Sequence, residues 1–279
     1  MILDGDEIYA GAALFHDVDK QFVAKGGRIV KYDINKKEFE FLGLPCERIY
    51  IQSMTYDKKR KMLYGFGASP EVFWKFDIEK REGGLVAYIG SGAEFAESHN
   101  PVVDDDGNVY GILRAFAFET GPDSLRLFCY HADTDTMEFL PISLPKKDAN
   151  DKANIDCAIN GGDGYLYFGT TSAQLIRFDP KERTCEVLHS VPGARRLAGL
   201  DRNPKDGYLY GITGEDYDTK LFCYDTKNNK LLWEEEFVSE NGERPVRIHY
   251  MTFSPDGRLF AGENDNHDRS CYLWECHIG

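Results

Sequence analysis

Two neighbouring segments decide the fold: Asp206-Gly207-Tyr208-Leu209-Tyr210-Gly211-Ile212-Thr213 and Phe222-Cys223-Tyr224-Asp225. The Asp-Gly pair favours a tight turn, because glycine accepts the positive φ that such turns require. The alternating aromatic and aliphatic residues behind the turn are typical of a β-strand. The second segment has the same alternation and ends on an acid. Together they predict a turn, a strand, a loop and a second strand.

This pattern recurs along the chain with a period of about 50 residues. One marker is the aromatic residue that ends each turn-and-strand unit, at Tyr9, Tyr64, Tyr110, Tyr167, Tyr210 and Phe260. A second marker is the aromatic residue of the strand that follows, at Tyr32, Phe76, Tyr130, Phe178, Tyr224 and Trp274. Because two independent markers share one period, the chain is predicted to be a repeat protein.

Four short strands in each repeat predict an all-β fold, a β-propeller of four-stranded blades. The predicted blades of a single domain, 1–279, are 1–44, 45–90, 91–142, 143–192, 193–240 and 241–279. The first repeat starts at the end of its inner strand and the last stops at its third, so the propeller is six- or seven-bladed with incomplete ends. We favour truncation as the explanation; loss of a seventh blade and a partner chain that closes the ring are the alternatives.

Net charge, hydropathy and cysteine content exclude several classes of function. The chain has 279 residues and a net charge of −14, which argues against a broad nucleic-acid or anionic-membrane surface. No apolar run is long enough for a transmembrane helix, and the start has no secretory signal. The seven cysteines include no C-x-x-C pair, which predicts reduced thiols. These features lead us to expect a cytoplasmic protein.

Candidate ligand-binding residues follow from the propeller geometry, which gathers the loops leading into each inner strand on one face. Arginines occupy this position repeatedly, and arginine suits bidentate capture of a carboxylate or phosphate. The alternative is that each arginine pairs with an acid of a neighbouring blade. The predicted substrate-binding residues are Arg48, Asn100, Arg114, Arg195, Arg196 and Arg247.

Candidate acids and bases lie at the same positions. His99 and His249 are predicted general bases, and Tyr50 and Tyr250 are predicted proton donors. The alternative for each histidine is a hydrogen-bonded residue that lines the channel.

Metal and cofactor signals are weak, and no cofactor is predicted. Asp104-Asp105-Asp106-Gly107-Asn108 is interpreted as an ordinary turn rather than a calcium loop. The segment from Glu263 to Asp268 is richer in oxygen ligands and is a minor candidate for a divalent metal. No serine-hydrolase elbow, phosphate loop, zinc-protease motif or dinucleotide fingerprint occurs.

The repeat as a whole resembles carbohydrate-active propellers. The motif Asp-Gly-x-h-Tyr-Gly, where h is hydrophobic, is followed by h-x-[Tyr/Phe]-Asp and by a short strand ending in Leu42-Gly43. This combination is similar to oligogalacturonate lyases, ulvan lyases and the propellers that cleave rhamnosyl–glucuronate linkages. The resemblance covers all six repeats and implies histidine, tyrosine and arginine at the channel mouth.

The leading hypothesis is therefore a carbohydrate-processing propeller, lyase- or glycosidase-like, acting on a small anionic sugar such as a uronate. An arginine would neutralise the carboxylate, a histidine would take the acidified proton, and a tyrosine would protonate the leaving oxygen. The alternative is a non-catalytic propeller that binds a protein or ligand on the same face. A lactonase-like metal hydrolase, with Asn100, Asn154 and Asp156, is a third hypothesis.

Overall fold

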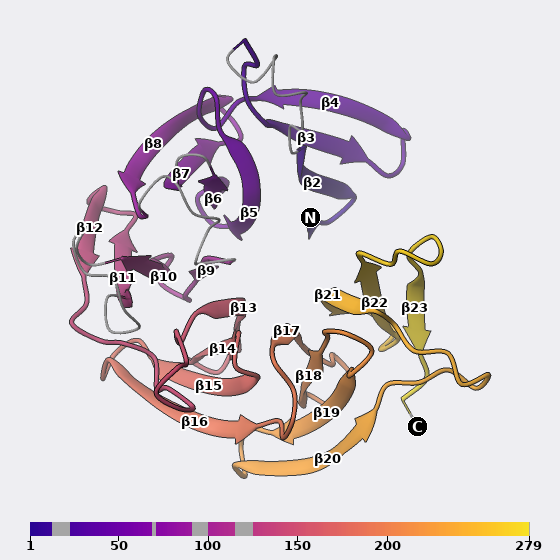
Figure 1. The fold of residues 1–279 in the computed structure, drawn as a ribbon. Helices are drawn as coiled ribbons and strands as arrows, with labels where there is room; N and C mark the ends of the chain where they lie inside the picture. The colour runs from indigo at the N-terminus through magenta and orange to yellow at the C-terminus, as the bar shows by residue number, and fades with distance from the viewer. Residues whose placement is uncertain (13–22, 69–70, 91–99, 115–124, 279) are drawn as a thin grey trace. The chain divides into compact units, whose positions relative to one another are not determined.

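The computed structural model describes residues 1–12, 23–68, 71–90, 100–114 and 125–278, and for Arg114 the backbone alone. This part of the chain divides into two compact units, Met1–Pro141 and Ile142–Gly279, which are described separately. Its regular structure consists of β-strands (Figure 1). No helix among the described residues has the length and apolarity needed to span a membrane.

The described residues of the first unit form three antiparallel sheets of four strands each. In chain order, their strands are β1 (Ile2–Asp4), β2 (Glu7–Ala12), β3 (Arg28–Asp33) and β4 (Glu38–Gly43); β5 (Tyr50–Asp57), β6 (Met62–Ala68), β7 (Val72–Asp77) and β8 (Glu82–Tyr88); β9 (Val102–Val103), β10 (Val109–Arg114), β11 (Leu125–His131) and β12 (Thr136–Phe139). Each sheet is a simple meander, so every strand pairs with its neighbours in sequence.

The second unit repeats the design. Its strands are β13 (Ile155–Asn160), β14 (Leu166–Thr170), β15 (Gln174–Asp179) and β16 (Thr184–Ser190); β17 (Leu197–Arg202), β18 (Leu209–Thr213), β19 (Lys220–Asp225) and β20 (Lys230–Glu236); β21 (Arg247–Phe253), β22 (Leu259–Asn264) and β23 (Leu273–Cys276). The last sheet has three strands among the described residues, and the first opens on the three-residue β1. Each predicted blade range contains one of these sheets.

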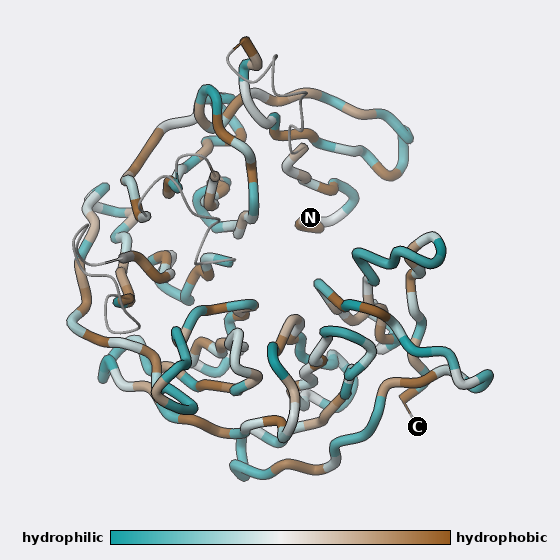
Figure 2. Tube along the Cα trace, viewed as in Figure 1, coloured by the Kyte–Doolittle hydropathy of each residue, from teal (hydrophilic) through white to brown (hydrophobic). Residues whose placement is uncertain are grey.

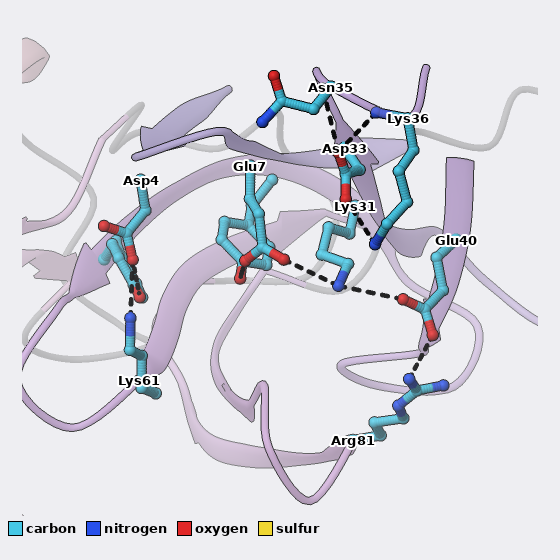
Figure 3. Close-up of polar contacts among 11 residues, drawn as sticks. Asp4, Glu7, Lys31, Asp33, Asn35, Lys36, Glu40, Lys61 and Arg81 are labelled. Atoms are coloured by element: carbon cyan, nitrogen blue, oxygen red, sulfur yellow. Dashed lines mark hydrogen bonds and ion pairs between the residues drawn. The ribbon is translucent and has the colours of Figure 1, made fainter. Parts of the chain in front are cut away.

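The acid after each repeated aromatic residue forms a hairpin turn. Asp33 accepts hydrogen bonds from the backbone N–H groups of Asn35 and Lys36, and Lys37 then adopts a positive φ of 58° (Figure 3). Asp179 forms the same contacts ahead of Arg183. The aromatic-Asp pair therefore encodes the turn between the third and fourth strands of a blade, because an aspartate side chain can satisfy the turn's amides.

The glycine of the Tyr-Gly pair makes room for an aromatic ring on the next strand. Gly211 pairs with Phe222, and a Cβ at Gly211 would lie 2.2 Å from the phenyl Cζ. Gly65 has the same relation to Trp74, also at 2.2 Å. This close approach explains why glycine follows tyrosine in the repeated phrase.

Hydrophobic cores form between consecutive sheets within each unit. In the first unit, β5 contacts both β2 and β9; in the second, β17 contacts both β13 and β21. One core joins Tyr167 and Leu175 to Phe222, and another joins Tyr210 to Met251 and Leu259. Ion pairs reinforce the arrangement: in the first unit Lys31 lies between Glu7 and Glu40 at 3.0 and 3.2 Å, and Glu40 also pairs with Arg81 (Figure 3).

Two smaller predictions are confirmed. Asp104 accepts hydrogen bonds from the backbone N–H groups of Asp106 and Asn108, so this segment is an ordinary turn. The seven cysteines are free thiols, with Cys271 exposed and the others buried or half-buried.

Candidate functional site

The predicted site residues fall into two sets, one in each unit. In the first unit Arg48 lies just before β5 and Tyr50 is the first residue of that strand. Asn100 precedes β9, and Arg114 ends β10. Arg48 has a positive φ of 58°, and its backbone N–H donates to the Lys25 carbonyl at 2.8 Å. His99 lies outside the described residues. The second unit holds Arg195 and Arg196 before β17, and Arg247, His249 and Tyr250 in β21.

A recurrent β-bulge positions two of the polar side chains in the second unit. The pairing of β13 with β14 shifts between Ile155 and Cys157, and the pairing of β21 with β22 shifts between Ile248 and Tyr250. The residues left out of the ladder are Asp156 and His249. A bulge redirects a side chain out of the regular alternation and is common beside functional sites. Equivalent strands therefore present an acid and a base at equivalent positions.

Arg196 is held by a buried carboxylate. Its Nε and Nη2 donate to the two carboxylate oxygens of Asp156, each at 2.6 Å. The Asp156 side chain is only 1% exposed and that of Arg196 14% exposed. Bidentate geometry and burial make this a strong pair, so the positive charge of Arg196 is largely compensated within the protein.

His249 lies against the same guanidinium, with 3.4 Å between its Nε2 and Nη1 of Arg196. Partial desolvation and the cationic Arg196 lower the pKa of His249 below its ordinary value. The imidazole is therefore neutral at neutral pH. A neutral imidazole can accept a proton, which keeps His249 suited to act as a base.

The other two arginines also face carboxylates. Arg247 lies 3.0 Å from Asp265, 3.5 Å from Glu215 and 3.8 Å from Asp216. Arg195 contacts Asp216 at 3.2 Å, although its side chain is 73% exposed. The sequence predicted this set of arginines, with pairing to acids of neighbouring blades as the alternative. Such pairs join Arg196 to Asp156, and Arg247 to Glu215 and Asp216. The contacts of Arg195 with Asp216 and of Arg247 with Asp265 lie within one blade.

Tyr250 stands apart from this network. It is 57% exposed, and in the part of the chain that the structure describes it makes no hydrogen bond to His249 or to an arginine. The buried amide oxygen of Asn154 likewise has no hydrogen-bond partner there.

The acids considered as metal ligands are engaged elsewhere. Glu263 accepts hydrogen bonds from the backbone N–H groups of Val246 and Tyr272, both at 3.0 Å, and from Arg269 at 2.7 Å. Asp265 pairs with Arg247. No group of three or more His, Cys, Asp or Glu side chains in the described ranges is arranged to hold a metal ion.

The sequence pattern assigned no role to Tyr217, and it indicated Glu263 and Asp268 only as the ends of a possible metal-binding segment. Tyr217 donates a hydrogen bond from its hydroxyl to Asp268 at 3.2 Å, and the two residues belong to the loops after β18 and β22. The only available signal was an exposed aromatic residue within the acidic run Glu215-Asp216-Tyr217-Asp218.

Comparison with known proteins identifies the fold. No family model matches the chain, and no curated protein matches it in sequence. A chain of the nidogen/laminin complex matches with a TM-score of 0.60 and 10% identity, covering 92% of this chain and 85% of the other. The extracellular domain of BT4673 from B. thetaiotaomicron matches with a TM-score of 0.58 and 12% identity. That match covers 88% of this chain but 30% of the other, so our chain spans about a third of its length. The fold of this chain is a six-bladed β-propeller.

Proposed function

We propose that this chain is a non-catalytic binding propeller that holds a polypeptide partner on the loops of its second unit. The proposal rests on one observation: the positive charges of its arginines are compensated by carboxylates of the protein itself. A site that processes uronates needs arginine charge free to meet the substrate carboxylate. Arg196 is instead clamped by Asp156, and Arg247 faces three carboxylates.

Two further features support a partner of this class. Loops on a rigid β scaffold are the usual place for protein recognition, and the loops after β18 and β22 expose aromatic and acidic side chains. The fold is also shared with a chain of the nidogen/laminin complex, which is a protein–protein assembly.

Processing of an anionic sugar is the second candidate function. It is favoured by the neutral His249, with Tyr250 next to it in sequence, and by the exposed guanidinium of Arg195. Arg195 would bind the uronate carboxylate, His249 would remove the adjacent C–H proton, and Tyr250 would protonate the leaving oxygen.

One experiment separates the two candidates. Synthetic basic, acidic and neutral peptides are titrated calorimetrically into the full chain, and oligogalacturonate and oligoglucuronate are incubated with it and analysed for products. We expect saturable binding of at least one peptide class and no sugar product. Consumption of a uronide that is lost in His249→Ala, with no peptide bound, would replace the binding function with the enzymatic one.

A further inference from the structure

Tyr217 is presented to solvent by an unusual backbone. Asp216 and Tyr217 are consecutive residues with positive φ, 53° and 64°, in the loop between β18 and β19. Each such conformation costs an L-residue of this kind about 1 kcal/mol or more. The Tyr217 N–H donates to the Val246 carbonyl at 3.1 Å, while its side chain stays 46% exposed. The loop therefore holds an aromatic ring in water at a cost in free energy.

The ring of Tyr217 lies among acidic side chains, and the nearby cations Arg269 and Arg247 are themselves paired with carboxylates. The Tyr217 hydroxyl donates to Asp268 in the loop between β22 and β23, which is hydrophilic along its course (Figure 2). Asp268 and Asp218 are exposed, and neither forms an ion pair among the described residues. Within that same set, the ring of Tyr217 has no aromatic or cationic neighbour stacked on it, whereas Arg269 lies 3.5 Å from the centroid of Tyr272.

The loop that carries Asp268 is held in place by Glu263. The Glu263 side chain is fully buried and bonds to Arg269 and to the backbone N–H groups of Val246 and Tyr272. Arg269 is therefore committed to Glu263 and Tyr272 rather than to Asp268. A surface that is already ordered loses less conformational entropy when a partner binds.

We propose that Tyr217, Asp218 and Asp268 form a binding site for a cationic side chain, lysine or arginine, of a partner polypeptide. The face of a tyrosine ring attracts a cation, and the two carboxylates supply the charge that a salt bridge needs. A chain with a net charge of −14 also draws a basic partner toward it. This inference rests on the proposed binding function and names the partner's chemistry.

The test uses fluorescently labelled octalysine, with octaglutamate as the opposite-charge probe, and follows anisotropy with the full chain at physiological salt. Tyr217→Ala should weaken octalysine binding roughly fivefold to tenfold, because it removes the ring face. Asp218→Asn should weaken it about threefold, the usual scale for an exposed ion pair. Tyr217→Phe keeps the ring, retains most of the binding and guards against an effect of misfolding.

Two matched controls isolate the site from the overall charge. Glu182→Gln removes one exposed acid from the turn between β15 and β16, and Tyr88→Ala removes an exposed tyrosine of β8. Both should bind octalysine within about twofold of the parent, because neither lies in the proposed site.

The outcomes distinguish the two proposals. Equal octalysine binding by Tyr217→Ala and the parent, or equal losses in Asp218→Asn and Glu182→Gln, would overturn the inference. Binding of acidic or neutral peptides alone would also overturn it and leave the binding function standing. Uronide turnover without any peptide binding would overturn both.

Discussion

Glu263 connects three separate segments of the second unit at the scale of a single residue. Its carboxylate accepts from Val246 before β21, from Arg269 in the following loop, and from Tyr272 ahead of β23. Burial raises the pKa of Glu263, but the Arg269 guanidinium and the amide donors outweigh it and lower the pKa to about 2. The side chain is therefore charged at neutral pH, and its charge holds these three segments together.

This pKa predicts how stability depends on pH. Since the folded pKa of about 2 is below the unfolded value, Glu263 stabilises the fold above about pH 4.5, and that contribution is lost as pH falls toward 2. Its full size is roughly 3 kcal/mol. Glu263→Gln should lower the free energy of unfolding at pH 7 by a similar amount. In this variant the free energy of unfolding should also fall less steeply as the pH decreases (the acid limb of the stability curve). Urea denaturation from pH 3 to 7 measures this, with Glu182→Gln as control. An unchanged acid limb in Glu263→Gln would contradict it.

At the scale of the element, a contact between a glycine and an aromatic ring recurs in several sheets. In three sheets a glycine of the second strand faces a large ring of the third: Gly65 with Trp74, Gly111 with Phe128 and Gly211 with Phe222. All six residues are buried. A side chain at the glycine would displace the ring and separate the sheets that pack on it.

Substituting one such glycine tests this. Gly211→Ala places a methyl group 2.2 Å from the Phe222 ring and should reduce the free energy of unfolding by about 1–3 kcal/mol. Gly84→Ala, on a strand where a Cβ would meet nothing within 4 Å, should be neutral or slightly stabilising. Guanidinium denaturation of both variants gives the comparison. A loss of the same size at Gly84 would show that general strand propensity, rather than the ring contact, is responsible.

The sequence was sufficient for what depends on local chemistry. The turns at Asp33 and Asp179 and the Tyr-Gly pairs depend on residues that are close together in the sequence. The period, the strands and the propeller fold were therefore predictable. The pairing of Arg196 with Asp156 was not, because the partners come from different sheets and a bulge in β13 sets the aspartate's direction. The presentation of Tyr217 was also hidden, since a left-handed tyrosine has no sequence signature.

At the scale of the whole molecule, packing between neighbouring sheets determines how cooperatively the chain unfolds. The chain forms two compact units, Met1–Pro141 and Ile142–Gly279, whereas the repeat predicts one domain. Each core lies between sheets, as β17 packing against β13 and β21 illustrates. A blade in such an array depends on its neighbours for burial of its faces.

We expect a single calorimetric transition whose van't Hoff and calorimetric enthalpies agree, which is the signature of one cooperative domain. Gly211→Ala should then shift the entire transition to lower temperature. Differential scanning calorimetry of the parent and this variant measures both quantities. Two resolved transitions, of which only one moves in Gly211→Ala, would instead establish the units as separate domains.

The left-handed pair Asp216-Tyr217 has a consequence for laboratory evolution. Glycine or asparagine tolerates this backbone better than tyrosine does, so a library selected for heat resistance alone should drift toward those residues at position 217. A library selected for capture of a basic peptide should keep tyrosine there. The two populations would then differ at position 217, and this difference would show that tyrosine is kept there for binding rather than for stability.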